Sequence, residues 1–322
     1  MIYVYFLIFV LFFVAELLYF KIADRFNIID KPNERSSHTK ITLRGGGIIF
    51  YIAMLVYLVY SGFSYPYFLG GLTLISVISF MDDVKPRSPK FRLTIHFVSI
   101  LLMFYQWNLF AITPWYVWLI ALILCIGILN AYNFMDGING ITGGYSFVVI
   151  LALWYINKII AINFVDNNII LFLLISLVVF NFFNFRKKAK CFAGDIGAVT
   201  IAFIIIFLIG KLMIITNDFS YIILLILYGV DTVLTIFHRI ILKEDLTQAH
   251  RKHMFQIMAN ELKIPHLKVS IIYMVVQTII IIGFFLVNYH YTYLFAIIVL
   301  LCIIYLLFMK KYFYLHKKNC SL

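Results

Sequence analysis

Long apolar runs recur from one end of the chain to the other, and no other feature of the sequence constrains the fold as strongly. Most runs approach the roughly 20 residues that a helix needs to cross the hydrocarbon core of a bilayer. Of the 322 residues, 64% are hydrophobic and only 12% are charged, whereas a soluble domain carries roughly 25% charged residues. We therefore expect a polytopic integral membrane protein.

The spans are expected to be helical, because lipid offers no hydrogen-bond partner to the backbone of an open strand. The sequence predicts an all-α fold of about eleven transmembrane helices in a single membrane-embedded domain, residues 1–322. The first apolar run has no basic leader or small-residue cleavage site, so we interpret it as a retained span and not as a signal peptide. The expected spans are 2–20, 45–61, 66–81, 91–107, 113–133, 141–156, 168–185, 197–215, 219–240, 269–287 and 291–309.

Lys and Arg gather in alternate connecting segments. All of the 26 basic residues except Lys158 and Lys211 lie in segments that follow odd-numbered spans. Since cytoplasmic loops are enriched in Lys and Arg, this pattern predicts an outside N-terminus and a cytoplasmic C-terminus in the plasma (inner) membrane. The net charge of +12 is then a one-sided basic face. It is either a topology signal alone or a site for anionic phosphates, and we expect no nucleic-acid partner.

An adjacent pair of carboxylates, Asp82 and Asp83, ends the third span. The segment that follows carries Lys85 and Lys90. Adjacent carboxylates suit a divalent cation or a proton acceptor, and nearby cations suit phosphate oxygens. Solvated loop charges are the alternative, but that interpretation does not explain carboxylates at span ends, where desolvation is costly.

A row of polar side chains at three-residue spacing crosses the end of the fifth span: Asn130, Asn133, Asp136 and Asn139. On a helix such a row drifts slowly around one side. Amides inside or beside a span are costly unless they form hydrogen bonds. The row therefore indicates either a pocket for a polar ligand, such as a nucleobase or a sugar, or hydrogen bonds between helices.

Two later segments combine ionisable groups with anion-binding features. Asp195 lies between glycines at an expected helix start, where free N–H groups favour anions and where an N-cap aspartate is also common. His250, Arg251 and His253 belong to a five-residue cluster of imidazoles and cations. Two acids inside spans, Glu16 and Asp231, are expected to form structural pairs, because an isolated carboxylate at that depth is costly.

Taken in order, these segments resemble the polyprenyl-phosphate N-acetylhexosamine-1-phosphate transferase family. The peptidoglycan phospho-N-acetylmuramoyl-pentapeptide transferase belongs to the same superfamily. The resemblance runs from the segment Asp30-Lys31-Pro32-Asn33-Glu34-Arg35-Ser36-Ser37-His38 to His253. It implies that undecaprenyl phosphate attacks the β-phosphate of a UDP-N-acetylhexosamine at the lipid bilayer surface and releases UMP. It also implies Mg²⁺, with Mn²⁺ as an alternative, and leaves a homodimer open.

The resemblance also implies residue roles. Asp195 matches the metal-binding aspartate, Phe192 the aromatic residue that stacks on uracil, and the polar row the nucleotide pocket. Asp82 and Asp83 match the acidic pair that deprotonates or positions the lipid phosphate. The histidine loop near the diphosphate is matched by His250 and His253. The remaining residues expected to bind substrate are Arg44, Lys85, Lys90 and Arg251.

Two features bear on the branch of the family. Asn139, at a position where the family often has Asp, resembles a subgroup that serves O-antigen and capsule synthesis, and the sequence His250-Arg251-Lys252-His253 resembles the hexosamine-1-phosphate branch. We therefore expect UDP-N-acetylglucosamine or a deoxy relative as donor, in preference to UDP-N-acetylmuramoyl-pentapeptide. A polytopic transporter is the alternative from another class; it would place more polar groups near the bilayer midplane.

Overall fold

The computed structural model describes residues 2–30, 41–245, 250–288 and 290–319, with backbone only from residue 316. Residues 31–38 of the resemblance lie outside the described residues. The helices are α1 (Ile2–Arg25), α2 (Ile48–Tyr60), α3 (Pro66–Val84), α4 (Pro89–Gln106), α5 (Leu109–Ile112), α6 (Trp115–Met135), α7 (Ile141–Lys158), α8 (Asn167–Asn184), α9 (Gly194–Thr216), η1 (Phe219–Leu225), α10 (Ile226–Ile241), α11 (Met254–Gln256), η2 (Ile257–Glu261), α12 (His266–Leu286) and α13 (His290–Asn319).

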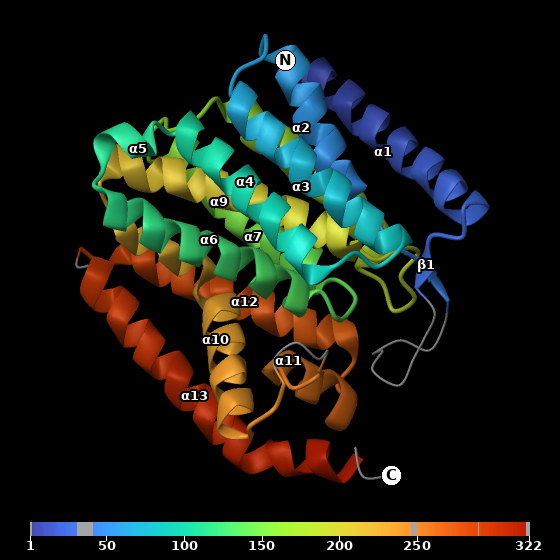
Figure 1. Ribbon diagram of the computed structural model, residues 1–322, viewed down its shortest axis with the longest axis vertical. Helices are drawn as coiled ribbons and strands as arrows, with labels where there is room; N and C mark the ends of the chain where they lie inside the picture. Colours follow the sequence, from blue (N-terminus) through green and yellow to red (C-terminus); the bar gives the residue numbers. More distant parts are fainter. Residues whose placement is uncertain (1, 31–40, 246–249, 289, 320–322) are drawn as a thin grey trace.

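The expected helical fold is confirmed apart from one small sheet. Strands β1 (Ile29–Asp30) and β2 (Thr42–Leu43) pair antiparallel, with Ile29 opposite Leu43. Figure 1 shows most helices side by side in one bundle, with β1 and α11 toward the same end. The strands thus lie at an end of the bundle and not within the apolar layer, where an open sheet edge would be costly.

Among the described residues, eight helical segments are long and apolar enough to cross a membrane, so the protein has the character of a multi-pass membrane protein. They include the continuous segment Phe219–Ile241, formed by η1 and α10, and α2 is a shorter apolar helix. Each of the eleven expected spans overlaps a helix, but those that overlap α2, α4 and α7 are not among the eight, so the number eleven stays a prediction.

Helix α9 is the central element of the bundle. Within its apolar window 72% of the residues are buried, compared with 22% in α1 and in α13. In Figure 1, α1 (blue) and α13 (red) lie on opposite sides of the bundle, and α9 runs between them. A polar contact joins it to α3 inside the bundle, where the hydroxyls of Ser76 in α3 and Thr200 in α9 are 2.9 Å apart. The start of this central helix is consequently well placed to be held by several neighbours.

The two acids inside spans have different partners. Asp231 in α10 accepts hydrogen bonds from the Met254 N–H and the Tyr273 hydroxyl, and its Oδ1 lies 3.6 Å from His253 Nδ1, so it is partnered as expected from the cost of an isolated charge. Glu16 in α1 is fully buried, and its Oε1 accepts a 3.7 Å contact from the Cys191 thiol. Within the described ranges Glu16 forms no ion pair, so its partner is a thiol and not a cation.

Close packing of α3 against α4 gives a stability prediction. A Cβ on Gly71 would lie 2.7 Å from the carbonyl oxygen of Ser99, whereas one on Gly70 would lie 3.9 Å from Cδ1 of Leu102. We expect Gly71→Ala to destabilise the protein by about 1–3 kcal/mol, as overpacking does. The neighbouring control Gly70→Ala should be neutral or stabilising, because alanine favours helix.

Thermal unfolding in detergent, followed by size-exclusion chromatography, measures both variants. Equal melting temperatures for the two alanine variants would contradict the close packing of α3 on α4 at Gly71.

Candidate active site

Backbone pairing brings the segment around Arg44 beside the start of α9. The Phe192 N–H donates to the carbonyl oxygen of Leu43 at 2.8 Å, and the Gly46 N–H donates to that of Phe192 at 2.9 Å. This pairing joins segments that are 151 positions apart at Arg44 and Asp195. It presents Arg44, Phe192 and Asp195 to one space.

Asp83, in the last turn of α3, caps the start of α9 from outside that helix. Its Oδ1 accepts from the Asp195 N–H at 2.8 Å and its Oδ2 from the Ile196 N–H at 3.0 Å. The first N–H groups of a helix need such acceptors. Gly194 has φ +71°, and a Cβ there would lie 2.5 Å from Asp83 Oδ2, so this approach requires glycine. Both oxygens of Asp83 are therefore used in positioning α9.

Two arginines link three carboxylates at this point. Arg44 lies 2.6 Å from Asp83 and 3.0 Å from Asp195. Arg92, at the start of α4, lies 2.8 Å from Asp82 and 3.6 Å from Asp195. Although burial alone lowers the pKa of Arg44, Asp83 and Asp195 raise it overall, so its guanidinium stays charged. The site thus holds two fixed cations and three carboxylates in contact.

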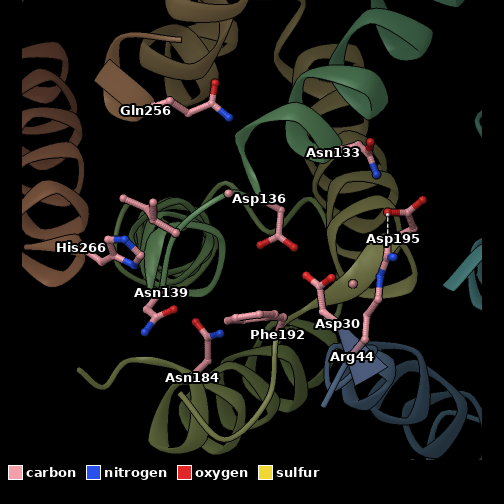
Figure 2. A pocket seen from close by; sticks show the side chains of 13 residues that line it. Asp30, Arg44, Asn133, Asp136, Asn139, Asn184, Phe192, Asp195, Gln256 and His266 are labelled. Atoms are coloured by element: carbon pink, nitrogen blue, oxygen red, sulfur yellow. Dashed lines mark hydrogen bonds and ion pairs between the residues drawn. The ribbon is translucent and has the colours of Figure 1, made fainter. Parts of the chain in front are cut away.

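The candidate site is a cavity of about 210 Å³ beside this cluster. In Figure 2 the carboxylates of Asp30 and Asp136 point toward its centre, and the ring of Phe192 lies along one side. Elements from β1 to α12 contribute to its wall. The lining residues are Asp30, Arg44, Asn133, Asp136, Gly137, Ile138, Asn139, Asn184, Phe192, Gly194, Asp195, Gln256 and His266.

Asp136 follows the end of α6 and is held by its own turn. Its Oδ1 accepts a hydrogen bond from the hydroxyl of Thr142 at 2.6 Å. Burial, with the negative charge of Asp195 also contributing, raises the pKa of Asp136 to about 6 despite this hydrogen bond. A cation in the cavity would favour the charged form of this carboxylate.

The predicted polar row divides into two groups. Asn133, Asp136 and Asn139 line the cavity. Asn130 does not: its amide donates to the carbonyl oxygen of Ile126 in its own helix at 2.8 Å. The side-chain amide of Asn139 donates to the carbonyl oxygen of Arg186 at 2.9 Å, and this hydrogen bond fixes the loop after α8. The row is thus part pocket wall and part structural hydrogen bonding, so both interpretations of the pattern apply.

The histidine segment lies beside the cavity. His250 and His253 are 5.0 Å apart between ring centroids, and each lies 6.2 Å from Phe134 near the end of α6. Neither lines the cavity, but Gln256 in the same segment does. Burial and the charges of His253, Arg239 and Lys252 lower the pKa of His250 to about 3, so its ring is neutral near pH 7.

The predicted basic residues occupy two environments. Arg44 lines the cavity, whereas Lys85 and Lys90 are exposed around the connection between α3 and α4. Arg251 is half-buried and is not among the lining residues. The exposed lysines form a basic surface next to Asp82, outside the cavity itself.

Several residues of the site were not singled out from the sequence. Arg92 stood among the basic residues of its segment, and only the folded chain places it between two carboxylates. Asn184 accepts from the Gly140 N–H at 2.8 Å and donates to the Cys191 carbonyl at 2.8 Å, so it joins two walls of the cavity. Asp30 begins the first segment of the resemblance but was given no role in the site, and Gln256 and His266 carried no motif signal. Their positions depend on contacts between distant segments.

The donor chemistry of the cavity fits Mg²⁺. Asp30, Asp136 and Asp195 provide hard oxygen atoms around one space. Across the part of the chain that the structure describes, no three His, Cys, Asp or Glu side chains are placed to share one ion. Mg²⁺ usually takes one or two carboxylates together with water and substrate phosphates, so a complete protein cage is not required. To bind the ion, Asp195 would have to give up one of its contacts with Arg44 and Arg92.

The raised pKa of Asp136 predicts pH-dependent stability. An aspartate titrates near about 3.9 in an unfolded chain, so the folded state holds this proton more tightly. The resulting stabilisation is complete below about pH 4 and is lost as the pH rises through about 6. As the pH rises from about 5 to about 7, the melting temperature of metal-free Asp136→Asn should fall less than that of the metal-free wild type. The difference between the two falls should be roughly 2–4 °C.

Asp218→Asn is the matched control, because Asp218 follows the opposite end of α9. Burial raises the pKa of Asp218, but hydrogen bonds from Ser220 lower it overall, so it does not titrate in this range. Parallel melting curves for the wild type and Asp136→Asn across these pH values would rule out the assigned titration.

Comparison with known proteins relates this chain to transferases. Residues 65–215 match the sequence model of glycosyl transferase family 4. A Bacillus subtilis (strain 168) relative, a probable undecaprenyl-phosphate N-acetylglucosaminyl 1-phosphate transferase, is 28% identical over 260 residues, covering 72% of this chain and 70% of the relative. An Escherichia coli O157:H7 undecaprenyl-phosphate alpha-N-acetylglucosaminyl 1-phosphate transferase is 24% identical over 218 residues, covering 59% and 56%. A Thermotoga neapolitana phospho-N-acetylmuramoyl-pentapeptide-transferase is 30% identical over 174 residues, covering 48% and 56%.

The family match extends from the residue before α3 to the end of α9 and includes Asp82, Asp136 and Asp195. These are carboxylates that the structure gathers in and beside the cavity. The resemblance found in the sequence is confirmed, because residues 65–215 of this chain are similar to glycosyl transferase family 4.

Proposed function

We propose that this protein transfers N-acetylglucosamine 1-phosphate from its UDP derivative to undecaprenyl phosphate, releases UMP and so initiates a cell-envelope polysaccharide. The observation that carries the proposal is the cavity in which Asp136, Phe192 and Asp195 meet at the ends of apolar helices. The Bacillus and Escherichia relatives are named for this reaction. A cavity at the helix ends suits a reaction between a membrane lipid and a water-soluble nucleotide.

The nucleotide sugar fits the cavity itself. The Phe192 ring offers a stacking surface for uracil, and amides from Asn133 and Asn139 border the same space. Arg44 lies at the wall with its charge fixed by Asp83 and Asp195. An arginine in this position suits phosphate oxygens, so we place the diphosphate between Arg44 and the carboxylates.

The lipid phosphate fits the side formed by α3 and α4. Asp82 accepts from the Arg87 N–H at 2.7 Å and from Arg92 at 2.8 Å, which fixes its orientation beside Asp195. Exposed Lys85 and Lys90 would attract the phosphate to this side. We assign Asp82 as the group that positions the lipid phosphate or takes its proton. Asp83 is the positioning partner, because both of its oxygens are already used.

The transfer forms one bond and breaks one. An oxygen of the lipid phosphate bonds to the β-phosphorus of the donor as the bond from that phosphorus to the bridging oxygen breaks. UMP leaves with the electron pair, and any proton on the lipid phosphate passes to Asp82. Mg²⁺, when bound by Asp195 and Asp136, would neutralise charge on the diphosphate. Arg44 and Arg92 orient the two substrates, because positioning and electrostatics carry most of this chemistry.

The orientation in the membrane follows from the distribution of charge. We propose eleven spans with the N-terminus outside and the cavity on the cytoplasmic face, since the site is built from the basic segments that follow odd-numbered spans. Lys158, an exception to the basic pattern, is exposed at the C-terminal end of α7. Inside-out vesicles should use added nucleotide sugar and intact cells should not; the reverse result would refute this orientation.

Donor competition tests the reaction. Purified protein with undecaprenyl phosphate and Mg²⁺ is given UDP-N-acetylglucosamine or UDP-N-acetylmuramoyl-pentapeptide, and lipid products are identified by mass spectrometry. We expect equimolar UMP and lipid-diphosphate-N-acetylglucosamine. A product from the pentapeptide donor alone would reject the sugar assignment, and no UMP from either donor would reject the transferase proposal.

Removal of the metal or of its carboxylate should stop turnover. We expect Asp195→Asn and chelation of Mg²⁺ each to lower UMP release by about 100-fold or more, because the developing charge would lose several kcal/mol of stabilisation. Asn130→Ala is a matched control in the polar row, because Asn130 does not line the cavity, and it should retain activity within about threefold. An Asp195→Asn protein with more than a tenth of wild-type activity would exclude Asp195 as an essential ligand.

A further inference from the structure

Asp231 is a buried acid in α10 that connects its own helix to the histidine segment and to α12. Its side chain is only 2% exposed, and its Oδ1 accepts from the hydroxyl of Thr235 in α10 at 3.3 Å. Its Oδ2 accepts from the hydroxyl of Tyr273 at 2.7 Å, and its Oδ1 accepts from the Met254 N–H at 3.0 Å. A carboxylate at this depth is costly unless it is well partnered. Its burial is therefore tied to one conformation of the segment.

His253 is held against the same carboxylate. Its Nδ1 lies 3.6 Å from Asp231 Oδ1, and its ring is 1% exposed. The backbone N–H of His253 also donates to Oε1 of Gln256 at 3.2 Å, which fixes the first turn of α11. At 3.6 Å the contact with Asp231 is longer than a hydrogen bond, so the carboxylate restrains the ring by close packing and by its charge. Asp231 and Gln256 thus restrain His253 from two sides.

The restrained segment reaches the cavity through its next residues. The Phe255 ring packs against Gly137, which follows Asp136, and it lies 5.9 Å from the His253 ring. Gln256 itself lines the cavity. Helix α12 supports both sides of this contact, because Ser270 donates to the carbonyl oxygen of Asn139 at 2.8 Å while Tyr273 binds Asp231. Asp231 is therefore linked to the site by packing and hydrogen bonds through residues that touch one another.

We propose that Asp231 is a positioning residue for the transfer reaction. It fixes His253 and the start of α11 against the turn that carries Asp136, and it does not touch substrate. This inference rests on the proposed function. The alternative is that Asp231 only stabilises the packing of α10 on α12. The two differ in one respect: a positioning residue acts through His253, and a packing residue does not.

Four variants separate these roles. Asp231→Ala removes every side-chain hydrogen bond at this position. Asp231→Asn keeps an acceptor oxygen for the Met254 N–H and offers an amide N–H that the Tyr273 hydroxyl can accept. Tyr273→Phe removes one hydrogen bond.

Tyr145→Phe is the matched control. Tyr145 is also fully buried and donates to Gln277 of α12 at 3.0 Å. Its hydrogen-bond and ring partners among the described residues lie in α6, α12 and the segment formed by η1 and α10, outside the histidine segment.

We expect Asp231→Ala to lower kcat by about 10–100-fold, the range seen when supporting residues of a site are removed. The KM for UDP-N-acetylglucosamine should change less than about threefold. Asp231→Asn should recover most of the loss, and Tyr145→Phe should match the wild type. A rise in KM as large as the fall in kcat would contradict positioning. A fall in kcat for Tyr145→Phe as large as that for Asp231→Ala would also contradict it.

A double variant tests whether Asp231 acts through His253. Asp231→Ala combined with His253→Ala should be no slower than His253→Ala alone, because a residue that works through another has no separate effect once that partner is gone. Effects that multiply would show that Asp231 acts independently and would overturn the proposal.

Hydrogen exchange gives a readout that does not require activity. Peptides that cover residues 250–256 should exchange at least about tenfold faster in Asp231→Ala than in Tyr145→Phe, because the Met254 N–H loses its acceptor. Unchanged exchange would refute the positioning contact itself. The wild-type protein could release no UMP while the two variants still show the expected difference in exchange. That result would refute the proposed function and the catalytic part of this inference, and it would leave the contact established.

Discussion

The contact of Asp83 with the first N–H groups of α9 is the interaction on which the rest of the site depends. A carboxylate from α3 accepts from Asp195 and Ile196, and the same carboxylate holds Arg44. Three segments that are far apart in the sequence therefore meet at one buried group. Because α9 is the most buried long helix in the bundle, fixing its start also fixes the position of Asp195 relative to every neighbouring helix end.

Most charged residues of this protein lie at the ends of apolar helices or between them, and the physics of the bilayer explains why. A charged group is tolerated near the hydrocarbon layer only where partners surround it. The cluster of Asp82, Arg92 and Asp195 satisfies that requirement at one edge of the cavity. Asp231 satisfies it with Met254, Tyr273 and His253 on another side. The interactions that offset the desolvation cost of these buried charges also fix the orientations of the reactive groups.

The Asp82 and Asp83 pair shows what a motif can and cannot predict. The sequence places both carboxylates at a span end, and it predicts a shared chemical role. In the folded chain Asp82 faces Arg92 and the basic connection, while both oxygens of Asp83 are used on α9 and Arg44. Asn130 is similar, since its spacing matches the polar row but its amide satisfies its own helix. Spacing identifies candidates, and only side-chain partners separate ligand contacts from structural ones.

Hydrophobicity alone determined that this chain is helical and multi-pass, because a backbone in lipid has few ways to satisfy its hydrogen bonds. The order of its polar segments carried the resemblance to the transferase family, since that order can be read from the sequence without knowledge of any contact. The tertiary structure decided which of them share one space. Arg92, Asn184 and Asp30 entered the site only because long-range pairing places them there. Such pairing depends on how α3, α8 and α9 pack, and local sequence patterns do not encode that arrangement.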